Sequence, residues 1–291
     1  MSVASESCGG GGACLMGIVR TLVVIAAFLA FAGEHNAHAA ELVLFAGAAS
    51  KPATAELVER FESETGHTVR IHFGNSGNVL FQMKIAGRGD IYFPGSPNFM
   101  DQAEREGLII HETRRIVAYL VPSINVQRGN PKKIKGLNDL TRGDIKVAIG
   151  NPRTVIVGTF AVEIFEHAHL ATEIRPRIVG YTESCAKTAN LLAMKSVDAI
   201  VGWRVQESWN PDNIETVLFP PDQIPRISYM PIAVSTFSEN VELATRFIDY
   251  ASSEKGKKIF EKWGYLTREE DARTYAPDAI ISGDYILPEG W

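Results

Sequence analysis

Two segments of the chain place small residues and a serine directly before a stretch with helical character. The first is residues 47–50 in LFAGAASKPATAELVERF, and the second is residues 74–77 in FGNSGNV. The first turn of a helix has backbone N–H groups without intrahelical acceptors and carries the positive end of the helix dipole. Small residues before such a turn let a ligand approach the backbone closely, so both segments are candidates for binding an anion.

Both segments also have an ordinary structural interpretation, because serine and asparagine commonly cap helices. Neither segment fits the phosphate-loop patterns G-x-x-x-x-G-K-[ST] or G-x-G-x-x-G. GNSGN is not the nucleophile motif G-x-S-x-G, since Asn78 stands where the last glycine belongs. The sequence contains no identifiable catalytic triad, glycosidase-like carboxylate pair or zinc-spaced Cys/His cluster, which argues against an enzyme and against a metal site.

The elements that would position these segments alternate along the chain, which predicts an α/β fold with a mostly parallel sheet covered by helices. Strands are expected at residues 41–45, 68–73, 91–93, 115–121, 145–149, 199–202, 216–219 and 227–234. Helices are expected at residues 53–64, 79–86, 99–106, 159–169, 188–194 and 241–263, the last with a break near Gly256. Ser50 is the expected N-cap of the first helix, with Pro52 in its first turn and Gly66 at its end.

The N-terminal 39 residues predict a cleaved secretory signal peptide. Arg20 precedes an apolar run that is too short for a stable membrane span, and Ala37-His38-Ala39 matches an A-x-A cleavage site. Cys8 and Cys14 belong to this leader, so Cys185 is the single cysteine of the mature chain and cannot form a disulfide within it. We therefore expect the mature protein in the periplasm.

The composition of the chain limits the kinds of partner that the protein can bind. The chain has 291 residues, of which 45% are hydrophobic and 22% are charged, with a formal net charge of −5. These values suit a globular protein with a sizeable core and carry no electrostatic footprint for nucleic acid or an anionic membrane.

A series of motifs resembles the periplasmic molybdate/tungstate-binding proteins of ABC importers, within the type II solute-binding proteins. The motifs are LFAGAAS, FESETGHTV, IHFGNSGNV, GRGDIYFPGS, VAIGNPRTVIVGTFA, VDAIVGW and SSEKGKKIFEKWGY, in family order over about residues 41–265. The resemblance implies two α/β lobes joined by two crossover strands, with a ligand cleft between the lobes. Residues 40–116 plus 231–291 would form lobe I and residues 117–230 lobe II, with RRIVAYLVPSI and ISYMPIAVS as the crossovers.

The same resemblance implies a ligand and its donors. Ser50 and Ser76 match the two ligand serines of one lobe, and Val157 and Cys185 match backbone donors of the other. Molybdate and tungstate carry no proton at neutral pH, so a site made of hydroxyl and amide donors suits them, and pre-aligned dipoles in a dry cleft need no counter-cation. The expected partners are this small oxyanion and the membrane permease of an ABC importer. We expect a monomer without a further cofactor.

Several residues near the expected cleft depart from the family pattern. Cys185 occupies a position where the usual role needs only the backbone, so its thiol could face the ligand. Gly202 stands where many members have a tyrosine, and Trp203 or Arg204 could replace the missing donor. Glu183 lies close to Cys185, and some tungstate-binding relatives add carboxylates to their site. Each residue also has an ordinary role: a buried hydrophobe for the cysteine, a core aromatic and a surface charge for the Trp-Arg pair, and a helix cap for the glutamate.

Two functions within the binding class stay open. The first is capture of molybdate or tungstate for an ABC importer. The second is a periplasmic sensor that binds another oxyanion, such as sulfate, phosphate or an arsenic oxyanion, and reports to a membrane receptor.

Overall fold

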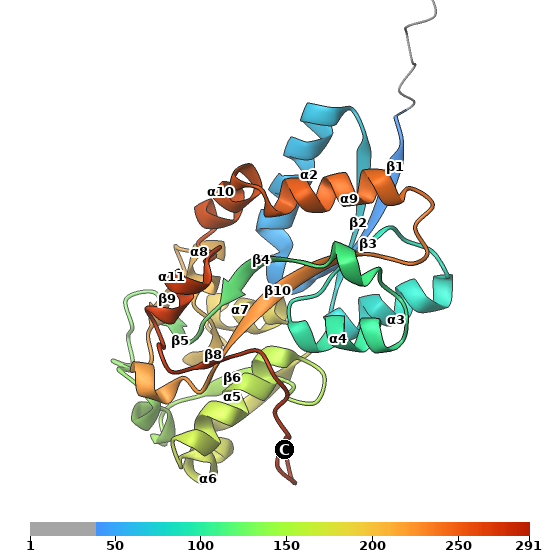
Figure 1. Cartoon of the computed structure of the whole chain (residues 1–291). Coiled ribbons are helices and arrows are strands. Elements are labelled where there is room, and N and C mark those ends of the chain that lie inside the picture. The colour runs from blue at the N-terminus through green and yellow to red at the C-terminus, as the bar shows by residue number, and fades with distance from the viewer. Residues whose placement is uncertain (1–38) are drawn as a thin grey trace, which may run out of the picture. The chain divides into compact units, whose positions relative to one another are not determined.

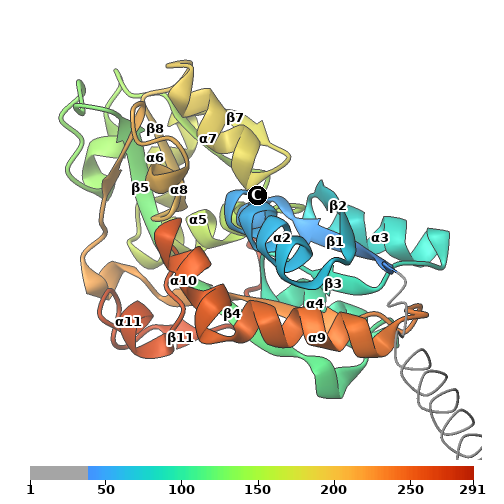
Figure 2. The same cartoon turned by 90° about the horizontal axis from the view of Figure 1, so that it is seen from above.

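The structure of the protein is a computed structural model that describes residues 39–291 (Figure 1). The predicted signal peptide, residues 1–39, lies outside the described residues except for its last residue. Residues 40–291 contain two β-sheets with helices packed against them. Seen from above, β1–β3 with α2 and α3 lie on one side, and β5, β7 and β8 with α7 lie on the other (Figure 2).

The first sheet has the strand order β11-β10-β3-β1-β2, with β4 paired to β10. Its strands β1 (Glu41–Gly47), β2 (Thr68–Gly74) and β3 (Ile91–Phe93) are parallel, whereas β10 (Arg226–Val234) runs antiparallel to β3. The helices of this part are α2 (Lys51–Thr65), α3 (Ser76–Ala86), α4 (Pro97–Arg105), α9 (Val241–Ser252) and α10 (Glu254–Lys262). Leu57 and Phe61 of α2 are buried against the sheet together with Phe247 of α9, as the apolar stripe of each helix requires.

The second sheet has the order β7-β6-β8-β5-β9. Its strands are β5 (Pro122–Gln127), β6 (Val147–Gly150), β7 (Ile178–Thr182), β8 (Ala199–Trp203) and β9 (Ile214–Val217). The strands β6, β7 and β8 are parallel, and β5 is antiparallel to both of its neighbours. The helices of this part are α5 (Ile156–His167), α6 (Ala171–Ile174), α7 (Cys185–Ala193) and α8 (Gln206–Trp209).

The two sheets are connected by the segments that the sequence predicts as crossovers. β4 (Arg115–Leu120) pairs with β10 and continues through Val121 into β5 of the second sheet. β10 pairs with β4 along most of its length and with β3 at its end. This arrangement confirms the predicted two-lobed α/β fold, while the exact lobe boundaries stay a prediction.

The C-terminal segment packs into the core beside the second sheet and adds a short strand to the first sheet. It includes α11 (Glu269–Arg273) and β11 (Ile280–Ile281), and β11 pairs in parallel with the start of β10. Trp291 packs on Phe165 of α5, and its Nε1 donates to Glu166 Oε1 at 2.9 Å. The segment is therefore anchored at its far end.

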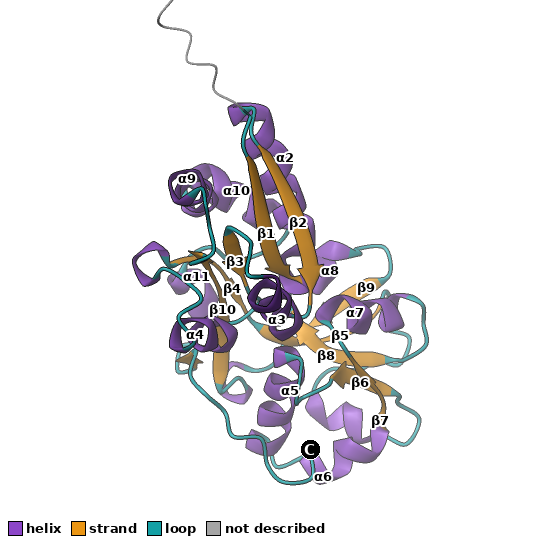
Figure 3. Ribbon diagram, turned by 90° about the vertical axis from the view of Figure 1, so that its right-hand side faces the viewer, coloured by secondary structure: helices purple, strands orange, loops and turns teal. Residues whose placement is uncertain are grey.

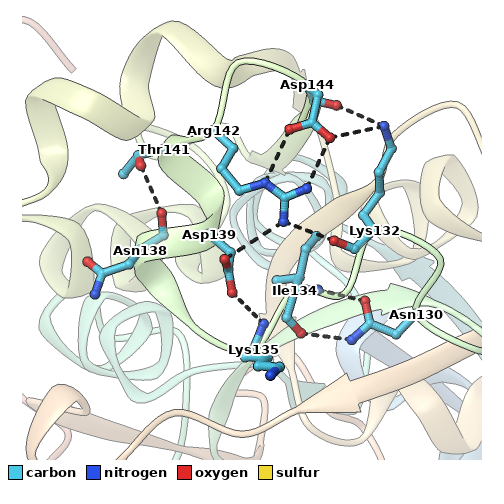
Figure 4. Close-up of polar contacts among 9 residues, drawn as sticks. All are labelled: Asn130, Lys132, Ile134, Lys135, Asn138, Asp139, Thr141, Arg142 and Asp144. Carbon is cyan, nitrogen blue, oxygen red and sulfur yellow. Dashed lines mark hydrogen bonds and ion pairs between the residues drawn. The ribbon is translucent and has the colours of Figure 1, made fainter.

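The loop between β5 and β6 holds its shape with its own polar contacts (Figure 4). Arg142 pairs with Asp144 at 3.0 Å and with Asp139 at 3.7 Å, and the Asn130 side chain bonds both backbone groups of Ile134. These ion pairs are exposed to water, which screens them, so they contribute little to the free energy of unfolding.

Candidate functional site

A small cavity lies where several helices begin. It is lined by Ala48 and Ala49 before α2, Ser76 at the start of α3, Ile156 at the start of α5, and Cys185 at the start of α7. The starts of α3, α5 and α7 are in the region between the two sheets in Figure 3. The cavity volume is about 20 Å³. The space between these helix starts is therefore small and suits a compact ligand such as one small ion.

The lining offers hydrogen-bond donors without charge. Within residues 39–291, the backbone N–H groups of Ser76, Ile156, Val157 and Cys185 have no hydrogen-bond acceptor, as expected for first helical turns. Among the described residues, no Asp, Glu, Lys, Arg or His lines this cavity. A pocket of this kind favours an anion through fixed dipoles and contains no carboxylate that would repel one.

The small residues at the end of β1 are explained by a close approach between segments. A Cβ atom at Gly47 would lie 2.7 Å from Gly95 N and 2.8 Å from Ser76 Oγ, so only glycine fits there. Gly95 N donates to Ser76 Oγ at 3.0 Å, which orients this hydroxyl and leaves its hydrogen free to donate. Gly47 therefore lets Ser76 reach the cavity.

The four donors implied by the family resemblance occupy different places. Ser76 and Cys185 line the cavity. Val157 has its side chain in the core and its amide in the first turn of α5, next to the lining residue Ile156. Ser50 is fully buried, its Oγ donates to Gly47 O at 3.0 Å, and the preceding alanines line the cavity.

Trp203, Arg204 and Glu183 lie away from the cavity lining, whereas Cys185 is part of it. Trp203 is fully buried and packs edge-on against Phe160 at 5.1 Å between ring centroids. The Arg204 guanidinium donates to Gly264 O and lies 5.2 Å from the centroid of the Tyr275 ring. Glu183 is exposed, and hydrogen bonding from Lys187 holds the pKa of its carboxyl below the ordinary value.

Asn75 makes a contact across the cleft that the sequence does not reveal. Its Oδ1 accepts from Gly77 N at 2.9 Å, as an N-cap should, while its Nδ2 donates to Thr154 O at 2.6 Å and to Glu183 O at 3.3 Å. Both acceptors precede helices of the second sheet, α5 and α7. Asn75 thus links the beginnings of three helices around the cavity.

A buried amide network supports the start of α7. Gln206 Nε2 donates to Cys185 O at 2.9 Å, and Gln206 Oε1 accepts from Trp203 N at 3.0 Å and from Asn125 Nδ2 at 2.9 Å. A Cβ atom at Gly202 would lie 1.9 Å from Gln206 Oε1. The glycine that replaces the family's tyrosine therefore makes room for Gln206, a residue that sequence reasoning missed.

The thiol of Cys185 is held in its neutral form. Burial raises the pKa of Cys185 from an ordinary value of 9.0 to about 11, and the Trp203 side chain beside it offsets only part of this rise. Cys185 is a free cysteine, and it is the only cysteine of residues 40–291. Its chemistry can therefore be followed without interference from other thiols.

We expect Cys185 to react with a thiol reagent at pH 7 at least about 100-fold more slowly in the folded protein than in urea, because two pKa units remove that much thiolate.

The raised pKa of Cys185 also makes the stability of the fold depend on pH: its contribution is fully present below pH 9 and is lost as the pH rises toward 11. Denaturant titrations from pH 8 to 11 should show that the free energy of unfolding falls more steeply with pH in the natural chain than in Cys185→Ala. An equal fall in both proteins would contradict the raised pKa of Cys185.

Residues 39–291 lack two other features that would indicate a function. No helix there is long and apolar enough to cross a membrane. The same residues contain no group of three or more His, Cys, Asp or Glu side chains placed to hold a metal ion. The described part of the chain thus presents the donor-lined cavity as its candidate site.

Two sheets linked by crossover strands, with a small anion-type cavity between helix starts, define a two-lobed solute-binding protein of the type II fold. Residues 42–266 match the family described as bacterial extracellular solute-binding protein, and the chain belongs to this family. It is therefore a solute-binding protein and not an enzyme.

Individual relatives are similar at low identity. The molybdate-binding protein ModA of Rhodobacter capsulatus is 21% identical over 238 residues, which cover 79% of this chain and 90% of ModA. The periplasmic molybdate-binding protein of Azotobacter vinelandii superposes with a TM-score of 0.69 at 17% identity, covering 78% and 100% of the two chains. The sulfate-binding protein SubI of Mycobacterium tuberculosis gives a TM-score of 0.70 at 16% identity, covering 81% and 89%. The two structures confirm the fold.

Proposed function

We propose that this protein captures a tetrahedral oxyanion, with molybdate or tungstate preferred, and delivers it as a periplasmic monomer to the permease of an ABC importer. The observation that carries the proposal is the cavity of about 20 Å³ whose lining has amide and hydroxyl donors and no charged side chain. Such a lining matches a dianion that has no proton to donate. The similarity to molybdate-binding relatives supports the same ligand.

Sulfate is the second candidate. It is also free of protons at neutral pH, so the same donors suit it, whereas inorganic phosphate retains a proton that calls for an acceptor. Among the described residues, the cavity lining contains no carboxylate that could accept this proton. The site can then distinguish molybdate from sulfate only by the size of the ion.

The donors proposed for the ligand come from both lobes. Ser76 contributes its hydroxyl, and the amides near Val157 and Cys185 contribute from the starts of α5 and α7. Ser50 can join them only by turning its hydroxyl away from Gly47 O. Binding between the lobes would favour the closed arrangement, in which Asn75 reaches Thr154.

Isothermal titration calorimetry of residues 40–291 with molybdate, tungstate, sulfate and phosphate tests this function. We expect one-to-one binding of molybdate or tungstate, and Ser76→Ala should weaken it by about 10- to 100-fold, because a hydrogen bond to a charged group contributes about 1.5–3 kcal/mol. Ser252→Ala is the matched control, since its hydroxyl bonds only to its own helix. The absence of any heat of binding with all four anions would refute the proposal. Ser50→Ala tests whether the second serine also contacts the ligand.

A further inference from the structure

The C-terminal segment, residues 267–291, lies beyond the residues that match the family. Most of it belongs to the lobe of the second sheet, because Ala272, Ala276 and Ala279 are buried in the core of that lobe. Trp291 packs on α5 at the far end, and the chain ends beside α6 (Figure 3). The segment is therefore expected to move together with the second sheet.

One short stretch of this segment reaches the other lobe. Asn98 of α4 donates from its Nδ2 to Asp284 Oδ1 at 2.7 Å and to Gly283 O at 3.4 Å. Helix α4 belongs to the lobe of the first sheet, since its buried Met100 lies in one core cluster with Tyr92 of β3. The C-terminal segment is thus bonded to both lobes.

The backbone around Gly283 fixes this stretch on β10 before it reaches α4. Ser282 N donates to Ile227 O at 3.0 Å, and the Arg226 guanidinium donates to Ser282 O. Gly283 has a φ of +96°, and a Cβ atom there would lie 2.6 Å from Arg226 Nη1, so the turn requires glycine. Asp284 therefore approaches α4 from a fixed base.

The contact with α4 lies close to the candidate site. Asn98 directly precedes Phe99, which lines the donor-lined cavity. Gly283 lines a neighbouring pocket together with Phe99 and with Thr154, which precedes α5. If the lobes separate, α4 moves away from the second sheet and the bond between Asn98 and Asp284 breaks. This bond therefore stabilises the closed arrangement, in which donors of both lobes face the cavity.

We propose that residues 282–284 form a strap that holds the two lobes together and slows the release of a bound ligand. The effect on release rests on the proposed oxyanion site, whereas the contact between the lobes does not. A hydrogen bond to a carboxylate is stronger than one between neutral groups, but this bond is exposed to water, which limits its contribution. The strap therefore tunes the rate of release and does not decide whether a ligand binds.

Stopped-flow tryptophan fluorescence of residues 40–291 with molybdate tests the strap. Asp284→Ala should raise the rate of molybdate release about 3- to 10-fold, the range expected for the net contribution of one hydrogen bond, and should leave the rate of association nearly unchanged. Asp284→Asn keeps an oxygen acceptor for Asn98 and should release molybdate nearly as slowly as the natural protein. Asp278→Ala removes another exposed aspartate of the same segment and is the matched control, which should change nothing.

The partner residue gives a second check on the same bond. Asn98→Ala should raise the release rate as much as Asp284→Ala, and the double variant should have no further effect, because either change removes the bond. Unchanged release in Asp284→Ala would overturn the inference while the proposed function stands. Slower release in both Asp284→Ala and Asp284→Asn would also overturn it, because the carboxylate would then act by repelling the anion.

A measurement without ligand separates the strap from the proposed function. Spin labels at Arg88→Cys, in the lobe of the first sheet, and at Glu173→Cys, in α6, report the distance between the lobes, because the natural Cys185 is buried. Asp284→Ala should broaden the distribution of this distance, and equal distributions in the two proteins would overturn the strap. If the natural protein binds none of the oxyanions, the proposed function fails, and a broadened distribution would still support the strap.

Discussion

Replacing Gly158 with alanine should lower the free energy of unfolding by about 3 kcal/mol, near the upper end of overpacking effects. A Cβ atom at position 158 would lie 2.0 Å from Gly150 O, 2.5 Å from Gly150 C and 2.9 Å from Pro152 N. All three atoms belong to the backbone, so the clash cannot be relieved by a side-chain rotation. Helix α5 would have to move away from β6. Urea titration followed by circular dichroism measures the change.

Gly136→Ala is the matched control, because a Cβ atom there has open space and the backbone is extended. It should leave the unfolding midpoint nearly unchanged. Displacement of α5 would also move the amides of Ile156 and Val157, so Gly158→Ala should weaken oxyanion binding at temperatures where it remains folded. A Gly158→Ala variant as stable as the natural protein would contradict the described contact between α5 and β6.

The first turns of three helices were not predicted from the sequence. Helices α3, α5 and α7 each begin three residues earlier than predicted, at Ser76, Ile156 and Cys185. The added turns contain Gly77 and Gly158, which are poor helix formers. Tertiary contacts stabilise these turns, and periodicity cannot detect such contacts. The residues that line the candidate site were therefore assigned to loops.

The predicted strands overlap eight strands of the structure, but β5, β7 and β11 were missed. β5 (Pro122–Gln127) is almost entirely buried, including Ser123 and Asn125, so it lacks the alternation of polar and apolar residues. β7 (Ile178–Thr182) is a short edge strand with little burial, and β11 (Ile280–Ile281) has two residues. The predicted break in the last long helix is real but occurs at Ser253, whose hydroxyl accepts from Gly256 N at 3.3 Å.

Only the features of the site that depend on neighbouring residues in the sequence could be predicted. Small residues before a helix indicate an anion, and Ser76 does line the cavity. The bonds of Asn75 to Thr154 and Glu183 join residues 79 and 108 positions apart, and no local pattern specifies them. The role of Gln206 in the buried amide network could not be predicted either, since it depends on the space that Gly202 leaves for its side chain.

Removing the carboxylate in Glu163→Ala should lower the free energy of unfolding by about 3–5 kcal/mol, because it leaves the Arg226 guanidinium buried without its counter-charge. Both side chains are 9% exposed, and Glu163 accepts from Arg226 Nε at 3.1 Å and from Nη2 at 2.9 Å. Asp144→Ala removes a carboxylate from an exposed pair and should change the free energy of unfolding far less, because water screens that pair. Thermal and urea unfolding of both variants gives the comparison.

The double variant Glu163→Leu with Arg226→Met tests whether the unpaired charge of Arg226 causes this loss of stability. If the unpaired charge dominates, the double variant should recover most of the stability, because an apolar pair of similar volume often replaces a buried ion pair without cost. If the double variant stays as unstable as Glu163→Ala, its own instability comes from the bond between Arg226 and Ser282 O, which the double variant also removes. That bond holds the C-terminal segment beside Gly283, so the second outcome would mean that this segment contributes directly to the stability of the fold.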